Sequence, residues 1–337
     1  MKLFQEYEMK GLRIKNRVVM PPMCMYKATS NGIANEFHYT HYSTRAIGGV
    51  GLIIFESTAV SPEGRITGND LGIWDDEHIH GLKKIVDACK AYGAKTALQI
   101  NHAGRKSTVE TCDILAPNAI RFSEDYRVPT ELTVEQIKKL VLDFKKAAQR
   151  ANEAGFDALE IHGAHGYLIH QFLSPLTNTR TDQYGGSLKN RIRFLKEVLE
   201  VVKAVWPDEK PVLLRVSASD YEQDGIDASQ MVQIIHEIRD YIDIAHVSSG
   251  GLLPSKVNAY PGYQVPFSEK IRNECSIPTI AVGLIKEADL AEEILSNQRA
   301  DLVALGRELL RNPYWVFNTA AKNNDDGYIP SSYKNAF

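Results

Sequence analysis

The sequence predicts a single (β/α)8 barrel over residues 1–337, with a short segment before the first strand and a tail after the last helix. Eight short apolar runs alternate with amphipathic stretches, which is the order of elements in a barrel. No linker rich in proline, glycine or serine is long enough to divide the chain into domains. No G-x-G-x-x-G motif follows a strand, as an open dinucleotide-binding sheet would require. The barrel therefore fits better than a doubly wound sheet.

The expected strands are short apolar runs bounded by glycine, proline or polar residues. In chain order they are Arg17–Met20, Leu52–Glu56, Thr96–Ile100, Ala158–His162, Val212–Val216, Ile244–Val247, Thr279–Val282 and Leu302–Leu305. Proline has no N–H to donate to a sheet, so Pro21 and Pro22 end the first strand.

The expected helices are stretches with apolar residues at helical spacing. In chain order they are His38–Ile47, Glu77–Tyr92, Thr133–Ala154, Asn190–Val205, Ser229–Tyr241, Phe267–Glu274, Ala288–Ser296 and Pro313–Lys322. Thr133 is followed three residues later by Gln136, a capping-box pattern that predicts a helix start at this point.

Charge and composition exclude several classes of partner and site. The net charge is −3 without clusters of Lys and Arg, so neither nucleic acid nor an anionic membrane is expected to bind. The N-terminus lacks the apolar core of a signal peptide, and no apolar run approaches the roughly 18 residues of a membrane span. We therefore expect a cytoplasmic protein. Four scattered cysteines without a C-x-x-C pair indicate no zinc ribbon, iron–sulfur cluster or disulfide.

The residues His162 to Tyr167 follow a buried strand and contain two imidazoles, two glycines and a phenol. Barrels of this class keep their chemistry at the C-terminal ends of the strands. Two ring N–H groups can donate to one oxygen, and a nearby phenol can supply a proton. The pattern thus indicates a site for an electron-rich oxygen, with a metal pair or two structural histidines as the alternatives.

Three late strands end in small residues. Ser248 to Gly251 follow the sixth strand, Gly283 follows the seventh, and Gly306 and Arg307 follow the eighth. Loops after strands seven and eight often bind phosphate in such barrels, because glycine lets backbone N–H groups approach and arginine forms forked hydrogen bonds. The pattern predicts a phosphate-bearing ligand. The alternative is that these glycines only end strands.

Polar side chains at other strand ends could bind a flat heterocycle. Gln99 ends the third strand, Arg215 lies within the fifth and Ser57 ends the second. An amide and a guanidinium that point into the barrel mouth offer donors and acceptors to a ring edge. An ion pair between Arg215 and Asp220 is the structural alternative.

The residues Pro21 to Tyr26 place a thiol and a second phenol after the first strand. Sulfur from Cys24 beside a redox-active ring could adjust its potential, and Tyr26 could bind substrate. For Met23 and Met25, a packing role is the favoured interpretation.

Several longer motifs are spread over nearly the whole chain. They are Pro22–Tyr26, Gly64–Thr67, Gln99–Lys106, His162–Pro175, Tyr184–Ser187 and Gly306–Arg311. Together these motifs resemble those of the Old Yellow Enzymes, in particular of their bacterial, thermophilic-type NADPH dehydrogenase subgroup, in which a cysteine stands near the flavin.

The resemblance implies an enzyme that contains flavin mononucleotide (FMN), takes hydride from NADPH and reduces activated C=C bonds by a ping-pong scheme. It implies that His162 and His165 bind the substrate's carbonyl oxygen, that Tyr167 protonates Cα, that Tyr26 helps to seat the substrate, and that Lys106 stands at the rim. The residues it assigns to FMN are Pro21, Pro22, Met23, Cys24, Ser57, Gln99, Arg215, Gly283, Gly306 and Arg307. The resemblance further implies that enones, quinones and nitro compounds are the substrates. It also implies a role in xenobiotic detoxification and an assembly into a homodimer or homotetramer.

The C-terminal tail departs from the family pattern. Relatives carry Tyr-x-Arg-x-aromatic, whose arginine reaches a neighbouring subunit's active site, whereas this chain ends Tyr333-Lys334-Asn335-Ala336-Phe337. Either Lys334 substitutes for the arginine or the shared site is altered, and the groups concerned are Lys334, Asn335 and Phe337.

Three other functions remain as alternatives. A dienoyl-CoA-type reductase has a similar barrel, but it carries extra domains and a cluster of cysteines. A flavin-binding redox sensor without turnover would be expected to lack Tyr167 or one of the histidines, and all three are present. A metal-dependent hydrolase would need a bridging carboxylate motif, which the sequence does not show, so no metal is expected.

Overall fold

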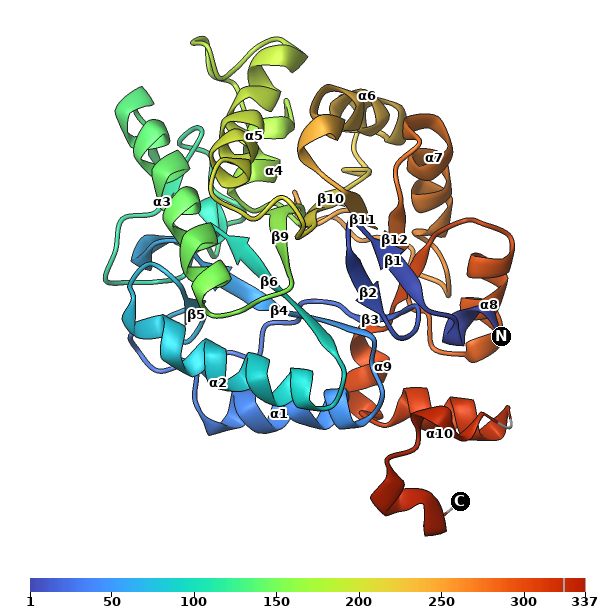
Figure 1. Cartoon of the computed structure of the whole chain (residues 1–337). Helices are drawn as coiled ribbons and strands as arrows, with labels where there is room; N and C mark the ends of the chain where they lie inside the picture. Colours follow the sequence, from blue (N-terminus) through green and yellow to red (C-terminus); the bar gives the residue numbers. More distant parts are fainter. Residues whose placement is uncertain (324, 337) are drawn as a thin grey trace.

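In the computed structural model, which describes residues 1–323 and 325–336, the chain forms a closed parallel barrel surrounded by helices (Figure 1). The barrel strands are β3 (Val18–Met20), β4 (Leu52–Ala59), β6 (Lys95–Asn101), β9 (Ala158–Gly163), β10 (Val212–Ser217), β11 (Ile244–Ser248), β12 (Thr279–Ala281) and β13 (Leu302–Ala304). They pair in chain order, and β3 also pairs with both β13 and β4, which closes the ring. The predicted (β/α)8 barrel is confirmed.

The outer helices follow the predicted order with small changes at their ends. They are α1 (Glu36–Ile47), α2 (Glu77–Ala91), α3 (Val134–Glu153), α5 (Leu188–Lys203), α6 (Ala228–Ile238), α7 (Val265–Cys275), α8 (Ala288–Ser296) and α10 (Trp315–Lys322). The predicted capping box before α3 is present, because Gln136 N donates to Thr133 Oγ1 and Thr133 N donates to Gln136 Oε1. The last helix begins at Trp315 and not at Pro313.

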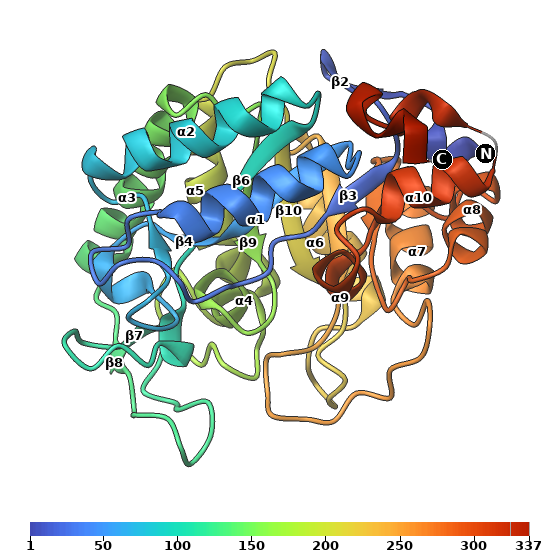
Figure 2. The same cartoon turned by 90° about the horizontal axis from the view of Figure 1, so that it is seen from below.

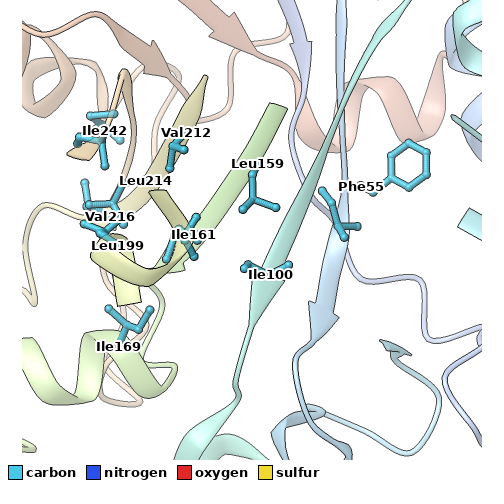
Figure 3. Packing of buried hydrophobic residues seen from close by; sticks show 14 of the residues in the cluster. Phe55, Ile100, Leu159, Ile161, Ile169, Leu199, Val212, Leu214, Val216 and Ile242 are labelled. Carbon is cyan, nitrogen blue, oxygen red and sulfur yellow. The ribbon is translucent and has the colours of Figure 1, made fainter. Parts of the chain in front are cut away.

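Side chains alternate between two apolar layers along each strand. On β4, Leu52 and Ile54 belong to the cluster inside the barrel, whereas Ile53 and Phe55 belong to the layer between strands and helices. Figure 3 shows part of this outer layer, where apolar side chains of β6, β9 and β10 lie together. Because both faces of these strands are buried, their sequences are continuous apolar runs.

The same alternation brings polar side chains to the inside of the barrel near the C-terminal ends of the strands. On β9, Ala158 belongs to the interior cluster and is followed two residues on by Glu160 and four residues on by His162. On β10, the interior residue Leu213 is followed by Arg215. The interior is therefore apolar toward the N-terminal ends of the strands and polar toward the mouth, where barrels of this class keep their sites.

Several short elements were not predicted. A hairpin of β1 (Tyr7–Met9) and β2 (Leu12–Ile14) places Met9, Leu12 and Ile14 in the interior cluster, so it closes the N-terminal end of the barrel. The others are β5 (Leu71–Gly72), β7 (Leu115–Ala116), β8 (Thr130–Glu131), α4 (Leu168–Leu173) and α9 (Gly306–Arg311). In Figure 2, α4, α9 and the loop with β7 and β8 lie toward one side, and both termini lie toward the other. None of the helices in the described ranges is long and apolar enough to cross a membrane.

Candidate active site

The predicted site residues lie at neighbouring strand ends around the barrel mouth. Arg215 on β10 is in register with His162 on β9 and with His246 on β11. Gln99 on β6 is in register with Glu160 on β9. Parallel pairing thus brings together the amide, guanidinium and imidazole groups that the sequence analysis singled out.

His162, His165 and Tyr167 form a compact group. The ring centroid of His162 lies 5.3 Å from that of His165 and 4.9 Å from that of Tyr167, and both contacts are edge-to-face. Burial, with a further contribution from the Arg215 charge, holds the pKa of each histidine well below its ordinary value, so both rings are neutral. Burial raises the pKa of the Tyr167 phenol well above 10, so this group keeps its proton at neutral pH.

Hydrogen bonds assign the proton on each imidazole. Nδ1 of His162 accepts from Ala164 N at 3.3 Å, so the proton of the neutral ring is on Nε2. Nε2 of His165 lies 2.7 Å from Oγ of Ser248, and that oxygen also accepts from Gln264 Nε2 at 3.1 Å. The Ser248 hydroxyl can therefore donate to His165, which leaves an N–H at Nδ1. Each ring then offers one N–H donor to a bound oxygen.

A buried carboxylate that the sequence analysis did not single out, Glu160, binds Gln99 and acts through its charge on Arg215. Glu160 Oε1 accepts from Gln99 Nε2 at 2.7 Å, and Oε2 lies 2.7 Å from Nδ1 of His246. Glu160 is fully buried, and its charge favours the protonated guanidinium of Arg215, whose pKa burial lowers. One N–H of the Gln99 amide is used in this way, and its second N–H and its oxygen make no hydrogen bond to the described residues, so both are available to a ligand.

The ion pair between Arg215 and Asp220, which was the structural alternative to ligand binding, does not form. Asp220 instead lies 2.9 Å from His170 through Oδ1 and Nε2. Nη1 of Arg215 makes a long contact of 3.5 Å with the carbonyl oxygen of Pro22, and Nε has no hydrogen-bond partner although it is buried. A buried guanidinium with a free N–H is suited to an electron-rich ligand atom.

A cavity of about 180 Å³ opens beside Arg215 at the ends of β11, β12 and β13. Gly283 lies on it with φ +126°, a backbone conformation that side chains rarely adopt, and a Cβ there would approach Gln264 N to 3.1 Å. The predicted Gly306 and Arg307 also line it. Lys286 and Arg311 line it as well, although the sequence analysis assigned neither of them to a ligand. The lining has glycine backbone and four basic side chains, Arg215 included, against the carboxylate of Glu308, which is paired with Arg311, and such a lining suits a phosphate.

The segment after β3 lies against this site through a second buried carboxylate. Oε2 of Glu56 accepts from Met25 N at 2.9 Å, which holds the backbone between Cys24 and Tyr26. Burial raises the pKa of Cys24, and the nearby Asp70 and Glu56 side chains raise it further, so it remains a thiol. Tyr26 has φ +54° and its side chain is exposed. Glu56 was predicted only as the end of a strand.

Lys106 lies beside the group but is occupied by protein contacts. Its Nζ donates to His165 O at 3.0 Å and to Gly251 O at 3.2 Å, and it lies 5.2 Å from the Tyr167 ring centroid. Burial lowers its pKa to about 8. The substrate contact implied for Lys106 stays a prediction.

The C-terminal tail lies apart from this mouth in the single chain. Lys334 and Asn335 belong to the exposed turn Ser331–Ala336, and Figure 1 shows this turn projecting from the barrel beside α10. Phe337 lies outside the described residues. In the described part of the chain, no group of three or more His, Cys, Asp or Glu side chains could hold a metal ion.

Comparison with known proteins identifies the family. The NADH:flavin oxidoreductase / NADH oxidase family matches residues 2–326. The chain belongs to this family. The membership bears out the predicted resemblance to the Old Yellow Enzymes, and the protein is an enzyme, a flavin-dependent oxidoreductase.

Individual relatives support the same assignment. The chain is 57% identical over 338 residues to an NADPH dehydrogenase of Clostridium acetobutylicum, with 100% of both chains covered. It is 53% identical over 320 residues to an NADPH dehydrogenase of Geobacillus thermodenitrificans, which covers 94% of this chain and 93% of the relative. The solved structure of morphinone reductase aligns with a TM-score of 0.81 at 31% identity, covering 92% of this chain and 87% of that one.

Proposed function

We propose that the protein uses NADPH to reduce the activated C=C bond of α,β-unsaturated carbonyl compounds and related alkenes in a ping-pong reaction. The observation that carries the proposal is the group at the barrel mouth in which the neutral ring of His162 contacts both the neutral ring of His165 and the protonated phenol of Tyr167. Such a group can hold an oxygen as it gains negative charge and can then deliver a proton.

FMN is the cofactor, and NADPH the reductant, that the family and its NADPH dehydrogenase members imply. The site fits FMN, because it combines the unpartnered Nε of Arg215, the free amide oxygen of Gln99 and a basic cavity with glycine backbone. We propose that the residues holding FMN are Pro21, Pro22, Met23, Cys24, Ser57, Gln99, Arg215, Gly283, Gly306 and Arg307. When bound, FMN supplies a two-electron relay from NADPH to the alkene.

His162 and His165 bind the carbonyl oxygen of the substrate through one N–H each. Negative charge grows on that oxygen as the β-carbon receives hydride, and donors already in place stabilise it without reorganisation. Tyr167 then gives its proton to Cα, and solvent replaces it. In total, the alkene, NADPH and one proton give the saturated product and NADP⁺. Tyr26 helps to seat the substrate, since its exposed phenol follows Cys24 at the same rim.

We propose that the substrates are electron-poor alkenes, quinones and nitro compounds. Each of these carries an oxygen that can accept hydrogen bonds from the N–H groups of His162 and His165. On the same resemblance we propose that the protein acts in xenobiotic detoxification in the cytoplasm as a homodimer or homotetramer. Sedimentation velocity of the purified protein tests the assembly.

An anaerobic absorbance titration tests the cofactor and the reaction together. NADPH is expected to bleach the visible flavin band, and cyclohexenone is expected to restore it with formation of cyclohexanone. A flavin that stays reduced in the presence of cyclohexenone would contradict alkene reduction. Release of FAD and not FMN on denaturation would contradict the cofactor assignment.

A further inference from the structure

The turn that carries His165 and Tyr167 has an unusual backbone. His165 has φ +57° and Gly166 has φ +72°, so two consecutive residues are in the left-handed region. A Cβ at Gly166 would collide with the carbonyl oxygen of Gly251. A non-glycine residue in this region costs about 1 kcal/mol or more, so the surrounding structure must hold His165 in place.

One restraint on the turn comes from the short helix that follows it. Gly166 N donates to Nδ1 of His170 on α4 at 2.9 Å. An imidazole nitrogen accepts a hydrogen bond only when it carries no proton, so the neutral ring must carry its proton on Nε2. In the other tautomer, the N–H at Nδ1 of His170 would face the N–H of Gly166, and no hydrogen bond could form between them. The backbone bond at Gly166 therefore depends on which nitrogen of His170 is protonated.

A buried carboxylate faces the other nitrogen. Oδ1 of Asp220 lies 2.9 Å from Nε2 of His170, and neither side chain is exposed. The contact is close enough for strong electrostatic attraction, although it lacks the geometry of a straight hydrogen bond, and neither atom has another hydrogen-bond partner among the described residues. Oδ2 of Asp220 accepts from Ser174 Oγ at 2.7 Å and from Ile226 N at 2.8 Å. Although burial raises the pKa of Asp220, His170 and these hydrogen bonds hold it below its ordinary value, so the group is a carboxylate. An acceptor at this place favours the proton on Nε2.

We propose that Asp220 and His170 are a positioning pair, in which the carboxylate fixes the His170 tautomer and the ring then holds the turn that aims His165 and Tyr167. Neither residue touches the reacting atoms, so their effect passes through the backbone at Gly166. The proposal rests on the proposed function, because it assigns the pair a role through the proton donor Tyr167.

The substitution Asp220→Asn tests the pair without changing its shape. Ser174 Oγ and Ile226 N are donors, so the single oxygen of asparagine must remain with them, and its NH2 group must face His170. Nε2 of His170 then has to accept a hydrogen bond from this NH2 group, so the neutral ring carries its proton on Nδ1. A protonated Nδ1 can no longer accept from Gly166 N. The matched variant His170→Gln keeps the pattern, since one amide offers an oxygen to Gly166 N and an N–H to Asp220.

Two readouts apply to the FMN-loaded enzyme. In protein labelled with ¹⁵N-histidine, the signals missing from His170→Gln identify His170, and their shifts report which nitrogen is protonated. Wild type is expected to carry the proton on Nε2, and Asp220→Asn on Nδ1. Reoxidation of the reduced flavin by cyclohexenone is expected to slow about 10- to 100-fold in Asp220→Asn, the usual cost of a misplaced or unsupported group, and to change little in His170→Gln.

A control variant separates this role from general loosening of the turn. Ser217→Ala removes the hydroxyl that accepts from His165 N at 3.0 Å, and it leaves His170 and Asp220 intact. Its His170 signals are expected to match wild type.

A wild-type His170 ring with its proton on Nδ1 would overturn the proposal. So would an Asp220→Asn variant with an unchanged His170 tautomer and an unchanged rate of flavin reoxidation. The tautomer is measured without substrate, so failure of alkene reduction in wild type would refute the proposed function separately. If Asp220→Asn does not fold, the proposal is still tested by the tautomer of His170 in wild type and by the rate of flavin reoxidation in His170→Gln.

Discussion

Nε2 of His165 lies 2.7 Å from Oγ of Ser248, so the last residue of β11 fixes a ring that belongs to the loop after β9. Ser248 in turn accepts from Gln264, the residue before α7. The orientation of an imidazole that we propose to bind the substrate is thus determined by residues about 80 and 100 positions further along the chain.

Removing this hydroxyl is expected to weaken oxygen binding. In Ser248→Ala, His165 can rotate and adopt either tautomer, so a para-substituted phenol should bind about two- to tenfold more weakly, the cost of one hydrogen bond of about 0.5–1.5 kcal/mol. The measurement is a titration that follows the flavin spectrum. Ser249→Ala is the matched control, since Ser249 bonds Tyr221 and Gln264 but not His165. Equal weakening in both variants would contradict the specific role of Ser248.

Tyr167→Phe removes the proposed proton donor and keeps the ring. Reduction of the flavin by NADPH should persist, and reoxidation by cyclohexenone should slow by about 10²–10⁴-fold, the range for loss of a positioned general acid. Stopped-flow absorbance measures the two half-reactions separately. Tyr26→Phe is the control at the same rim and should change substrate affinity more than the limiting rate. Equal slowing of both half-reactions in Tyr167→Phe would show that the phenol has another role.

Arg215→Met is expected to separate cofactor binding from protein stability. The guanidinium is 8% exposed and its Nε has no partner, so the flavin-free protein gains little from it. FMN should bind about 10- to 100-fold more weakly, because hydrogen bonds to charged groups contribute about 1.5–3 kcal/mol. Flavin fluorescence gives the affinity, and urea unfolding of the flavin-free protein gives the stability. A large loss of stability with unchanged FMN affinity would mean that Arg215 mainly serves as a partner for Glu160.

Much of the barrel could be predicted from the sequence, because strands buried on both faces are continuous apolar runs. The polar residues that interrupt these runs, such as Gln99, His162 and Arg215, were recognisable for the same reason. The hairpin β1–β2 was missed, since each of its three-residue strands has a charged residue at its centre and so lacks the continuous apolar run that marks the barrel strands. Its role in closing the barrel depends on the completed fold.

The partners of the site residues could not be predicted in the same way. Asp220 was considered as an alternative partner of Arg215, five residues away in sequence, but it contacts His170, fifty residues away. Such pairs are set by the register of neighbouring strands and by the path of the loops, which no single segment encodes. Glu56 and Glu160 also interrupt apolar runs, but their roles were overlooked because they depend on partners from neighbouring strands and loops, which the sequence does not reveal.

Glu56→Gln is expected to change the pH dependence of stability. Burial raises the pKa of Glu56 to about 7, so between its ordinary 4.5 and about 7 the folded protein keeps a proton that the unfolded chain has lost. The contribution of Glu56 to the free energy of unfolding therefore decreases as the pH rises from 4.5 to about 7. Nε2 of His38 lies 3.6 Å from Oε1 of Glu56, and burial lowers the pKa of His38 from 6.5 to about 4. The contribution of His38 to the free energy of unfolding therefore increases as the pH rises from about 4 to 6.5, opposite to that of Glu56.

The variant retains the His38 contribution and loses that of Glu56. Relative to wild type, its free energy of unfolding should therefore increase from pH 4.5 to pH 7 and then stay level, as urea unfolding of the flavin-free protein at four pH values would show. Tyr42, which donates to Glu56 at 3.1 Å, has its pKa raised well above 10 by burial and does not titrate in this range. Glu36→Gln on the surface of α1 is the control and should follow wild type. Parallel curves for wild type and Glu56→Gln would mean that Glu56 is ionised throughout, held by Met25 N and the Tyr42 hydroxyl.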